Sequence, residues 1–381
     1  MDGDCAGGSV TWSLTAAHTD RSQKGLVLAM RKYFIDNLRY GVVISVIWYH
    51  IFYEFNSVGV IRNVDIQGIP ALDVVEYVLY PWFMAFLFLI AGISARYALQ
   101  KRSHKEFLRE RVRKLLIPSV AVMFLIGWPM GLINNYYYDM FQGNGDRIPG
   151  VVKYLIYCFC GTGPLWFCRE LFLGSLLLLL LRKLDKKDRL WQWGGRVSFP
   201  AVLLFFFLVW GSSQILNMPV VEVYRNGIYL CMFFLGYAVF SHDRVQEMLE
   251  KHKLLLLTAA TVLGIMYVFR FWGMNYGATA NLRGPLVNAY AWFACLALLG
   301  CGRAWWNRET AFTRYMRERS FGFFILHIYL IVLFAWGIDR LLHPGAVWYY
   351  ILEMVLLAVF MPVLYEILSR IPVVRRLFFG K

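Results

Sequence analysis

The sequence has few charged residues. Only 17% of its 381 positions are Asp, Glu, Lys or Arg, whereas soluble domains carry about 25%. This shortage excludes an ordinary soluble protein. Aromatic residues make up 18% of the chain, which excludes a disordered chain because disordered segments contain few aromatics.

Several chemical signatures are also missing. The seven cysteines are scattered, and no CxxC pair or Cys/His spacing predicts a metal site. The sequence has no GxxxxGK[ST], GxSxG or HExxH motif, so a phosphate-binding loop, a nucleophile elbow and a zinc-protease helix are not expected. We expect free, buried thiols and no metal.

Long apolar runs take the place of these features. Runs of about 18 or more apolar residues mark membrane helices. They predict an all-α integral membrane protein with about ten transmembrane helices around a central polar cavity. The predicted spans are 38–58, 76–98, 114–134, 164–182, 198–215, 225–241, 253–271, 284–302, 319–340 and 346–369. The apolar segment 148–162 is too short to span, so we expect it to lie at the interface or to re-enter the membrane.

The distribution of basic residues gives the orientation. Of the 39 Lys and Arg residues, 29 fall in the N-terminal segment, the C-terminal tail and the loops on that side, and 7 fall on the other side. Basic loops stay in the cytoplasm, so both termini are predicted to be cytoplasmic. The net charge of +15 is explained by membrane topology, and no nucleic-acid partner is expected.

The first 29 residues differ from the rest. They lack the apolar stretch of a signal peptide and are rich in Gly, Ser, Thr and Ala. We predict a disordered N-terminal extension at 1–29 and a membrane domain at 30–381, with Met30 as an alternative start.

The first span carries an ordered set of ionisable side chains. Arg39 and His50 are eleven residues apart, which is three helical turns plus about 20°, so both lie on one face about 16 Å apart. Glu54 follows His50 by four residues and could orient the imidazole. We predict a phosphate-binding cation at Arg39 and a base at His50, because ionisable groups inside membranes are functional by default. The alternative to a functional role is structural: Asp36 and Arg39 form a capping pair, and His50 forms a hydrogen bond with a neighbouring helix.

Other candidate residues lie in later spans and loops. Cations at the start of a helix can clamp phosphates, although composition alone favours anchoring on the cytoplasmic side as their explanation. Arg96 or Arg169 could bind a carboxylate of a ligand, and His327 is either a substrate contact or a structural hydrogen-bonding group. Besides the first-span residues, the candidates are Glu170 as a catalytic group and Arg96, Arg111, Arg113, Lys114, Trp166, Arg169 and His327 as binding residues.

These residues together resemble acyltransferase family 3, the integral-membrane O-acyltransferases, over residues 30–381. The resemblance rests on Arg39 with ten residues before His50, on Ala91-Gly92-Ile93 with the basic stretch ending at Pro118, on Leu165-Trp166-Phe167, and on Gly322 to His327. The chain departs from the family pattern at Ala91, where Ser is usual, and at Pro164, where His or Asn is frequent. Within the family it is similar to the glucans biosynthesis protein C type.

The resemblance implies an activity and a location. It implies transfer of an acyl group from cytoplasmic acyl-CoA, with acetyl-CoA and succinyl-CoA as the candidate donors. It implies a carbohydrate or other hydroxyl acceptor at the outer side of a bacterial-type inner membrane. Essential roles carry over to Arg39 and His50, and contacts to CoA phosphates to Arg111, Arg113 and Lys114.

A proton-coupled transporter is the alternative from a different class. Transporters use chains of buried His, Glu and Arg residues as relays. The sequence shows no repeated half-pattern of broken helices, which many transporters have. An enzyme should release free CoA thiol, whereas a transporter should need no acyl-CoA.

Overall fold

The computed structural model describes residues 32–219 and 223–381, so the predicted extension 1–29 and Met30 lie outside the described residues. The chain is a helical bundle with one short antiparallel hairpin, in which Asn217 pairs with Arg225. The helices are α2 Tyr33–Tyr53, α3 Val74–Leu79, α4 Phe83–Lys101, α5 His104–Arg111, α6 Ile117–Tyr138, α7 Gly150–Cys160, α8 Leu165–Leu184, α9 Arg189–Gly194, α10 Phe199–Ser212, α11 Asn226–Leu235, α12 Asp243–Lys251, α13 Lys253–Phe271, α14 Thr279–Leu282, α15 Pro285–Trp305, α16 Ala311–Leu341, α17 Ala346–Arg370 and α18 Pro372–Phe379. The strands are β1 Asn217–Pro219 and β2 Val223–Arg225.

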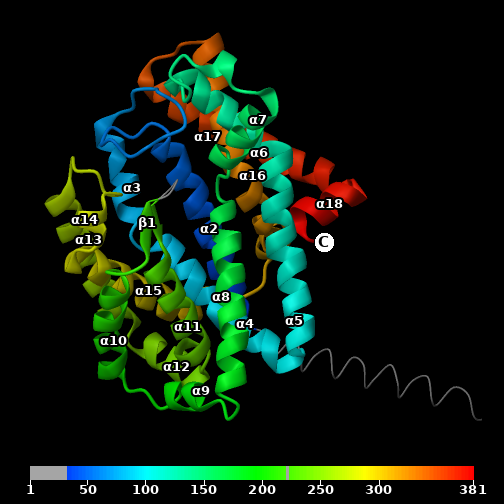
Figure 1. Cartoon of the computed structure of the whole chain (residues 1–381). Coiled ribbons are helices and arrows are strands. Elements are labelled where there is room, and N and C mark those ends of the chain that lie inside the picture. The colour runs from blue at the N-terminus through cyan, green and yellow to red at the C-terminus, as the bar shows by residue number, and fades with distance from the viewer. Residues whose placement is uncertain (1–31, 220–222) are drawn as a thin grey trace, which may run out of the picture.

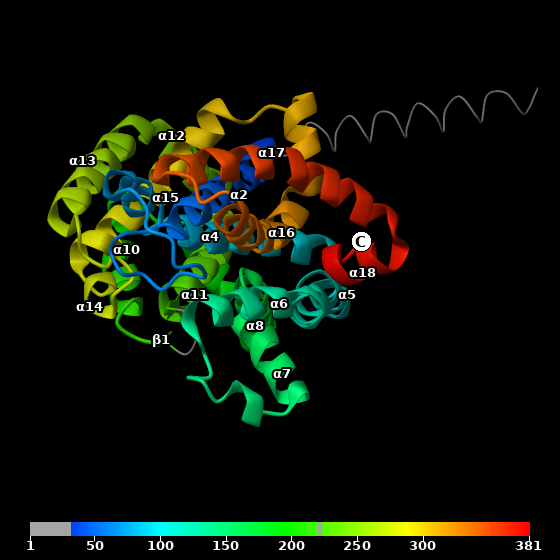
Figure 2. The same cartoon turned by 90° about the horizontal axis from the view of Figure 1, so that it is seen from above.

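The helix α2 lies in the interior of the bundle. It contacts α3, α4, α15, α16 and α17, and the view from above shows α4, α15, α16 and α17 beside it (Figure 2). The helices α5, α9 and α12 lie at the end opposite to α7 (Figure 1). This central position brings the ionisable face of α2 against α4 and α16.

The number of membrane spans is only partly settled by the structure. Within the described residues, six helices or continuous helix pairs are long and apolar enough to cross a membrane, and the count is seven if α7 and α8 form one bent span. A helix overlaps each of the ten predicted spans, but α10 and α11 are short and α2 carries charged residues. The all-helical membrane fold is confirmed, apart from the hairpin; the count of ten, the cavity and the orientation of the termini stay predictions.

A close approach of backbones fixes α4 against α11. A Cβ atom on Gly92 would lie 2.0 Å from the carbonyl oxygen of Phe233, and one on Gly236 would lie 2.1 Å from the carbonyl oxygen of Leu89. Only glycine allows such contact, since any Cβ would overlap the opposing backbone. Gly92, which is part of the family resemblance, therefore has a packing role.

The predicted non-spanning segment 148–162 forms α7, which bends by 73° into α8. Gly163 adopts a left-handed φ of 52° in this break, a conformation that glycine accepts without strain. The hydroxyl of Tyr329 on α16 donates to the carbonyl of Thr162 at 3.1 Å. The break between α7 and α8 therefore lies against α16. Its contact on α16, Tyr329, is two residues along the chain from His327.

Candidate active site

Arg39 lies on α2, and its guanidinium has protein partners but remains partly exposed. Nη1 is 3.1 Å from Asp36 Oδ1, and Nη2 donates to the hydroxyl of Ser94 on α4 at 2.7 Å. The side chain keeps 39% of its surface exposed, and Arg111 lies within electrostatic range of it. The predicted Asp36–Arg39 contact is present, and Arg39 still has surface for an anionic ligand. The contact to Ser94 had no signal in the sequence.

His50 lies three helical turns after Arg39, on the same face of α2, and contacts a second histidine. His50 Nδ1 is 2.8 Å from the carbonyl oxygen of Val46 and 3.2 Å from Nε2 of His327. His327 Nδ1 is 2.7 Å from the carbonyl oxygen of Phe324. The two imidazole rings meet edge to face, with their centres 4.8 Å apart.

The structure thus brings together two predicted site residues that are 277 positions apart in the chain. His327 is fully buried, whereas His50 is only partly buried. The sequence predicts each histidine separately, at mid-depth of its own span, but nothing in it predicts their contact. That contact depends on the packing of α16 against α2.

Glu54 is buried one turn beyond His50 and binds a different partner from the one predicted. Its carboxylate accepts hydrogen bonds from the backbone N–H of Asn63 at 2.9 Å and from the side-chain Nδ2 of Asn63 at 2.5 Å. Glu54 therefore holds the loop that follows α2 in place through Asn63. The imidazole of His50 contacts His327 and not Glu54. A catalytic role for Glu54 stays a prediction that this geometry does not favour.

The basic stretch covers the end of α5 and the π-helical turn Val112–Leu116, which leads into α6. Arg111 stacks on the ring of Phe107 at 4.6 Å, and its buried Nε has no hydrogen-bond partner among the described residues. Lys114 pairs with Glu110 at 2.5 Å, and Arg113 is exposed. Arg111 and Arg113 thus offer guanidinium groups to an anion, and contact with CoA stays a prediction.

Arg96 differs from Arg39 because its guanidinium is buried and is held by several side chains. Nη1 donates to Asp188 Oδ2 at 2.7 Å and to the hydroxyl of Tyr237 at 3.0 Å, and the guanidinium stacks on Trp191 at 4.0 Å. The side chain is 8% exposed. This geometry favours a role in joining α4, α9 and the π-helical turn Gly236–Phe240 that follows α11, and a substrate contact by Arg96 stays a prediction.

The first turns of α8 hold three further predicted residues. The ring of Trp166 stacks on Tyr229 at 5.3 Å. Arg169 is half-buried, with a contact of 3.7 Å to the sulfur of Met123, and Glu170 has a buried Oε1 without a hydrogen-bond partner among the described residues. The structure places these residues on a different element from His50, and no contact that it records joins them to the histidine pair.

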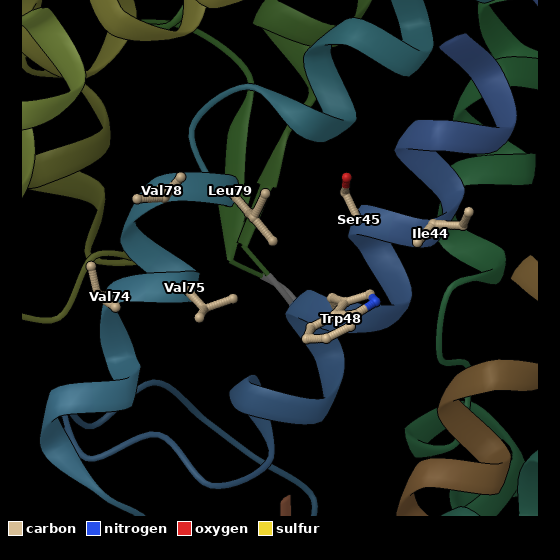
Figure 3. A pocket seen from close by; sticks show the side chains of 7 residues that line it. All are labelled: Ile44, Ser45, Trp48, Val74, Val75, Val78 and Leu79. Atoms are coloured by element: carbon tan, nitrogen blue, oxygen red, sulfur yellow. The ribbon is translucent and has the colours of Figure 1, made fainter. Parts of the chain in front are cut away.

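A shallow groove of about 340 Å³ opens between α2 and α3 (Figure 3). It meets α2 at Trp48, which is nine residues from Arg39 and therefore lies on the opposite face of the helix. The groove is thus separate from the Arg39–His50 face. Its lining residues are Ile44, Ser45, Trp48, Val74, Val75, Val78 and Leu79.

Comparison with known families places the chain in one of them. The model of an acyltransferase domain matches residues 32–366. This range covers all the elements from α2 to most of α17 and includes every site residue discussed above. No curated protein and no solved structure matches the chain. The match extends over nearly the whole chain, and the protein therefore belongs to acyltransferase family 3.

Proposed function

We propose that the protein transfers an acyl group, acetyl or succinyl, from cytoplasmic acyl-CoA to a hydroxyl of an acceptor at the extracytoplasmic side of a bacterial-type inner membrane. The acceptor class that we favour is a carbohydrate. The observation that carries the proposal is the face of α2, on which a partly exposed Arg39 precedes a His50 that is paired with a second histidine.

The donor binds from the end of the bundle that carries Arg39 and the basic stretch. Guanidinium groups recognise phosphates through paired hydrogen bonds. Arg39 and Arg111 lie within electrostatic range of each other, and such close cations favour a ligand with several negative charges. The pantetheine arm of CoA then runs along α2 and brings the thioester to His50.

The chemistry uses His50 as a general base. His50 Nε2 takes the proton of the acceptor hydroxyl while the hydroxyl oxygen attacks the thioester carbonyl. The tetrahedral intermediate collapses, the carbon–sulfur bond breaks, and the thiolate of CoA takes the proton from the imidazolium. In the alternative sequence, Nε2 attacks first and carries the acyl group to the acceptor. Both routes yield an ester and free CoA thiol.

Binding and turnover of purified protein test the proposal. Acetyl-CoA and succinyl-CoA are titrated against the detergent-purified chain, and release of CoA thiol is followed with a thiol reagent in the presence of candidate glycan acceptors. Arg39→Ala should weaken donor binding, and His50→Ala should abolish thiol release while donor binding persists. Ser45→Ala is the matched control, because Ser45 lies in the groove on the other face of α2.

Two results would contradict the proposal. The first is full transfer activity in His50→Ala. The second is a folded wild-type protein that binds neither donor.

A proton-coupled transporter is the second candidate. The observation in its favour is Glu353 on α17, which is fully buried and has two carboxylate oxygens without hydrogen-bond partners among the described residues. Such groups serve as proton relays in membranes. Transport without consumption of acyl-CoA would favour this candidate over the enzyme.

A further inference from the structure

The hydrogen bonds of the histidine pair determine where the protons lie. Val46 and Phe324 contribute carbonyl oxygens, which only accept hydrogen bonds. The short contacts of both Nδ1 atoms to these carbonyls, at 2.8 Å and 2.7 Å, therefore require an N–H at Nδ1 of each neutral ring. Nε2 of His327 is then an unprotonated acceptor, and it lies 3.2 Å from Nδ1 of His50.

The same pattern fixes the reactive nitrogen of His50. Its Nδ1–H is shared between the Val46 carbonyl and Nε2 of His327. Its Nε2 carries the lone pair and is the nitrogen left for a substrate. A general base needs such an orienting acceptor on the other ring nitrogen, as the aspartate supplies in serine-protease triads.

We propose that His327 is a positioning residue, which together with the Val46 carbonyl holds His50 in the Nδ1–H form and stabilises the imidazolium that forms when Nε2 takes the hydroxyl proton. This role rests on the proposed function, in which His50 is the base. It differs from the substrate contact predicted for His327, because the buried ring reaches the reaction only through His50.

A neutral partner suits this location better than a carboxylate would. A buried carboxylate in a membrane interior carries a large desolvation penalty, whereas a neutral imidazole accepts the same hydrogen bond without one. The other titratable side chains whose rings face His50 are Tyr49 at 5.0 Å and Tyr53 at 5.7 Å, both from α2 itself. His327 is the partner that the neighbouring α16 supplies.

Two substitutions separate positioning from simple packing. His327→Phe keeps an aromatic ring but removes the acceptor, whereas His327→Gln keeps an acceptor and a donor. We expect His327→Phe to lower kcat by roughly 10–100-fold, as loss of a supporting partner does in metal sites, with the Kd for acyl-CoA within about twofold of wild type. His327→Gln should recover a large part of kcat.

Three results would overturn the role. These are a kcat for His327→Phe within twofold of wild type, a His327→Gln variant no more active than His327→Phe, and loss of donor binding in both variants. The last result would make His327 a packing residue.

A spectroscopic measurement keeps this inference separate from the proposed function. The chain contains seven histidines, and ¹⁵N-histidine NMR of the full chain in bilayers distinguishes protonated from unprotonated ring nitrogens. The signal of His50 is assigned by its loss in His50→Ala. We expect protonated Nδ1 and unprotonated Nε2 in wild type, and a larger share of the Nε2–H form in His327→Phe, in which the Val46 carbonyl alone accepts from Nδ1. A His50 protonated at Nε2 would overturn the inference even in an active acyltransferase, whereas the expected form in a chain without transfer activity would contradict only the proposed function.

Discussion

At the scale of single residues, the partners of a buried charge decide what the charge does. Arg39 and Arg96 both lie in predicted spans, and the sequence predicts a ligand contact for each. In the structure Arg96 is held by Asp188, Tyr237 and Trp191, whereas Arg39 keeps 39% of its side chain exposed. A buried guanidinium held by other side chains stabilises the fold, and one with exposed surface is available to a ligand.

We expect Arg96→Met to destabilise the protein without changing donor recognition. Hydrogen bonds to charged groups contribute about 1.5–3 kcal/mol each, so unfolding in detergent should show a free energy of unfolding lower by about that amount. The KM for acyl-CoA should stay within about twofold of wild type, because Arg96 has no surface for the donor. A large rise in KM with unchanged stability would show instead that Arg96 binds substrate.

We expect Arg39→Lys to weaken donor binding even though the charge is kept. Lysine provides a point charge in place of the planar fork that binds phosphate through two hydrogen bonds. The KM for acyl-CoA should rise by about tenfold, which corresponds to about 1.4 kcal/mol. The control is Ser94→Ala, which removes one hydrogen bond from Arg39 and should have a smaller effect. Equal kinetics for Arg39→Lys and wild type would place the phosphates elsewhere.

At the scale of elements, polar turns extend helices beyond their apolar runs. The predicted span 319–340 corresponds to α16, which begins at Ala311 after a capping box formed by Thr310 and Thr313. Hydropathy detects only the membrane-embedded part of such a helix. Hydropathy also fails to predict the close contact at Gly92, because the packing of two backbones sets the geometry of α4 against α11.

We expect Gly92→Ala to reduce the yield of folded protein sharply. The added Cβ would lie 2.0 Å from the Phe233 carbonyl oxygen, so two backbones would have to separate. Size-exclusion chromatography in detergent and the melting temperature measure the effect. Gly337→Ala is the matched control, because a Cβ there meets nothing within 4 Å and alanine is the better helix former. A stable, monodisperse Gly92→Ala variant would contradict the close approach.

At the scale of the whole molecule, basic loops that are distant in sequence meet at one end of the bundle. Lys32 pairs with Asp243, and Arg303 pairs with Glu247 at 2.9 Å and Glu250 at 2.8 Å. The positive-inside rule predicts that this end lies in the cytoplasm. Donor entry at Arg39 and acceptor entry at the far end both depend on that assignment.

We expect impermeant maleimide to distinguish the two ends of a cysteine-free variant. Ile61→Cys, at a side chain that is 82% exposed after α2, should react from the outside of right-side-out vesicles. Leu184→Cys, at a side chain that is 77% exposed at the end of α8, should react only after permeabilisation. Labelling of Leu184→Cys from the outside, with Ile61→Cys labelled only after permeabilisation, would show the opposite topology and would contradict the proposed path of the donor.

The sequence alone determines the class of the fold and the identity of the first-span residues. Apolar runs report burial in lipid directly, and a fixed rotation per residue places Arg39 and His50 on one face of any helix. Only the tertiary structure decides which other side chains join them, because contacts between helices depend on packing geometry that hydropathy does not encode. The packing of α16 against α2 sets the partner of His50 to be His327, and the loop after α2 turns Glu54 towards Asn63. The first-span pair follows from local geometry, and its surroundings follow from the fold.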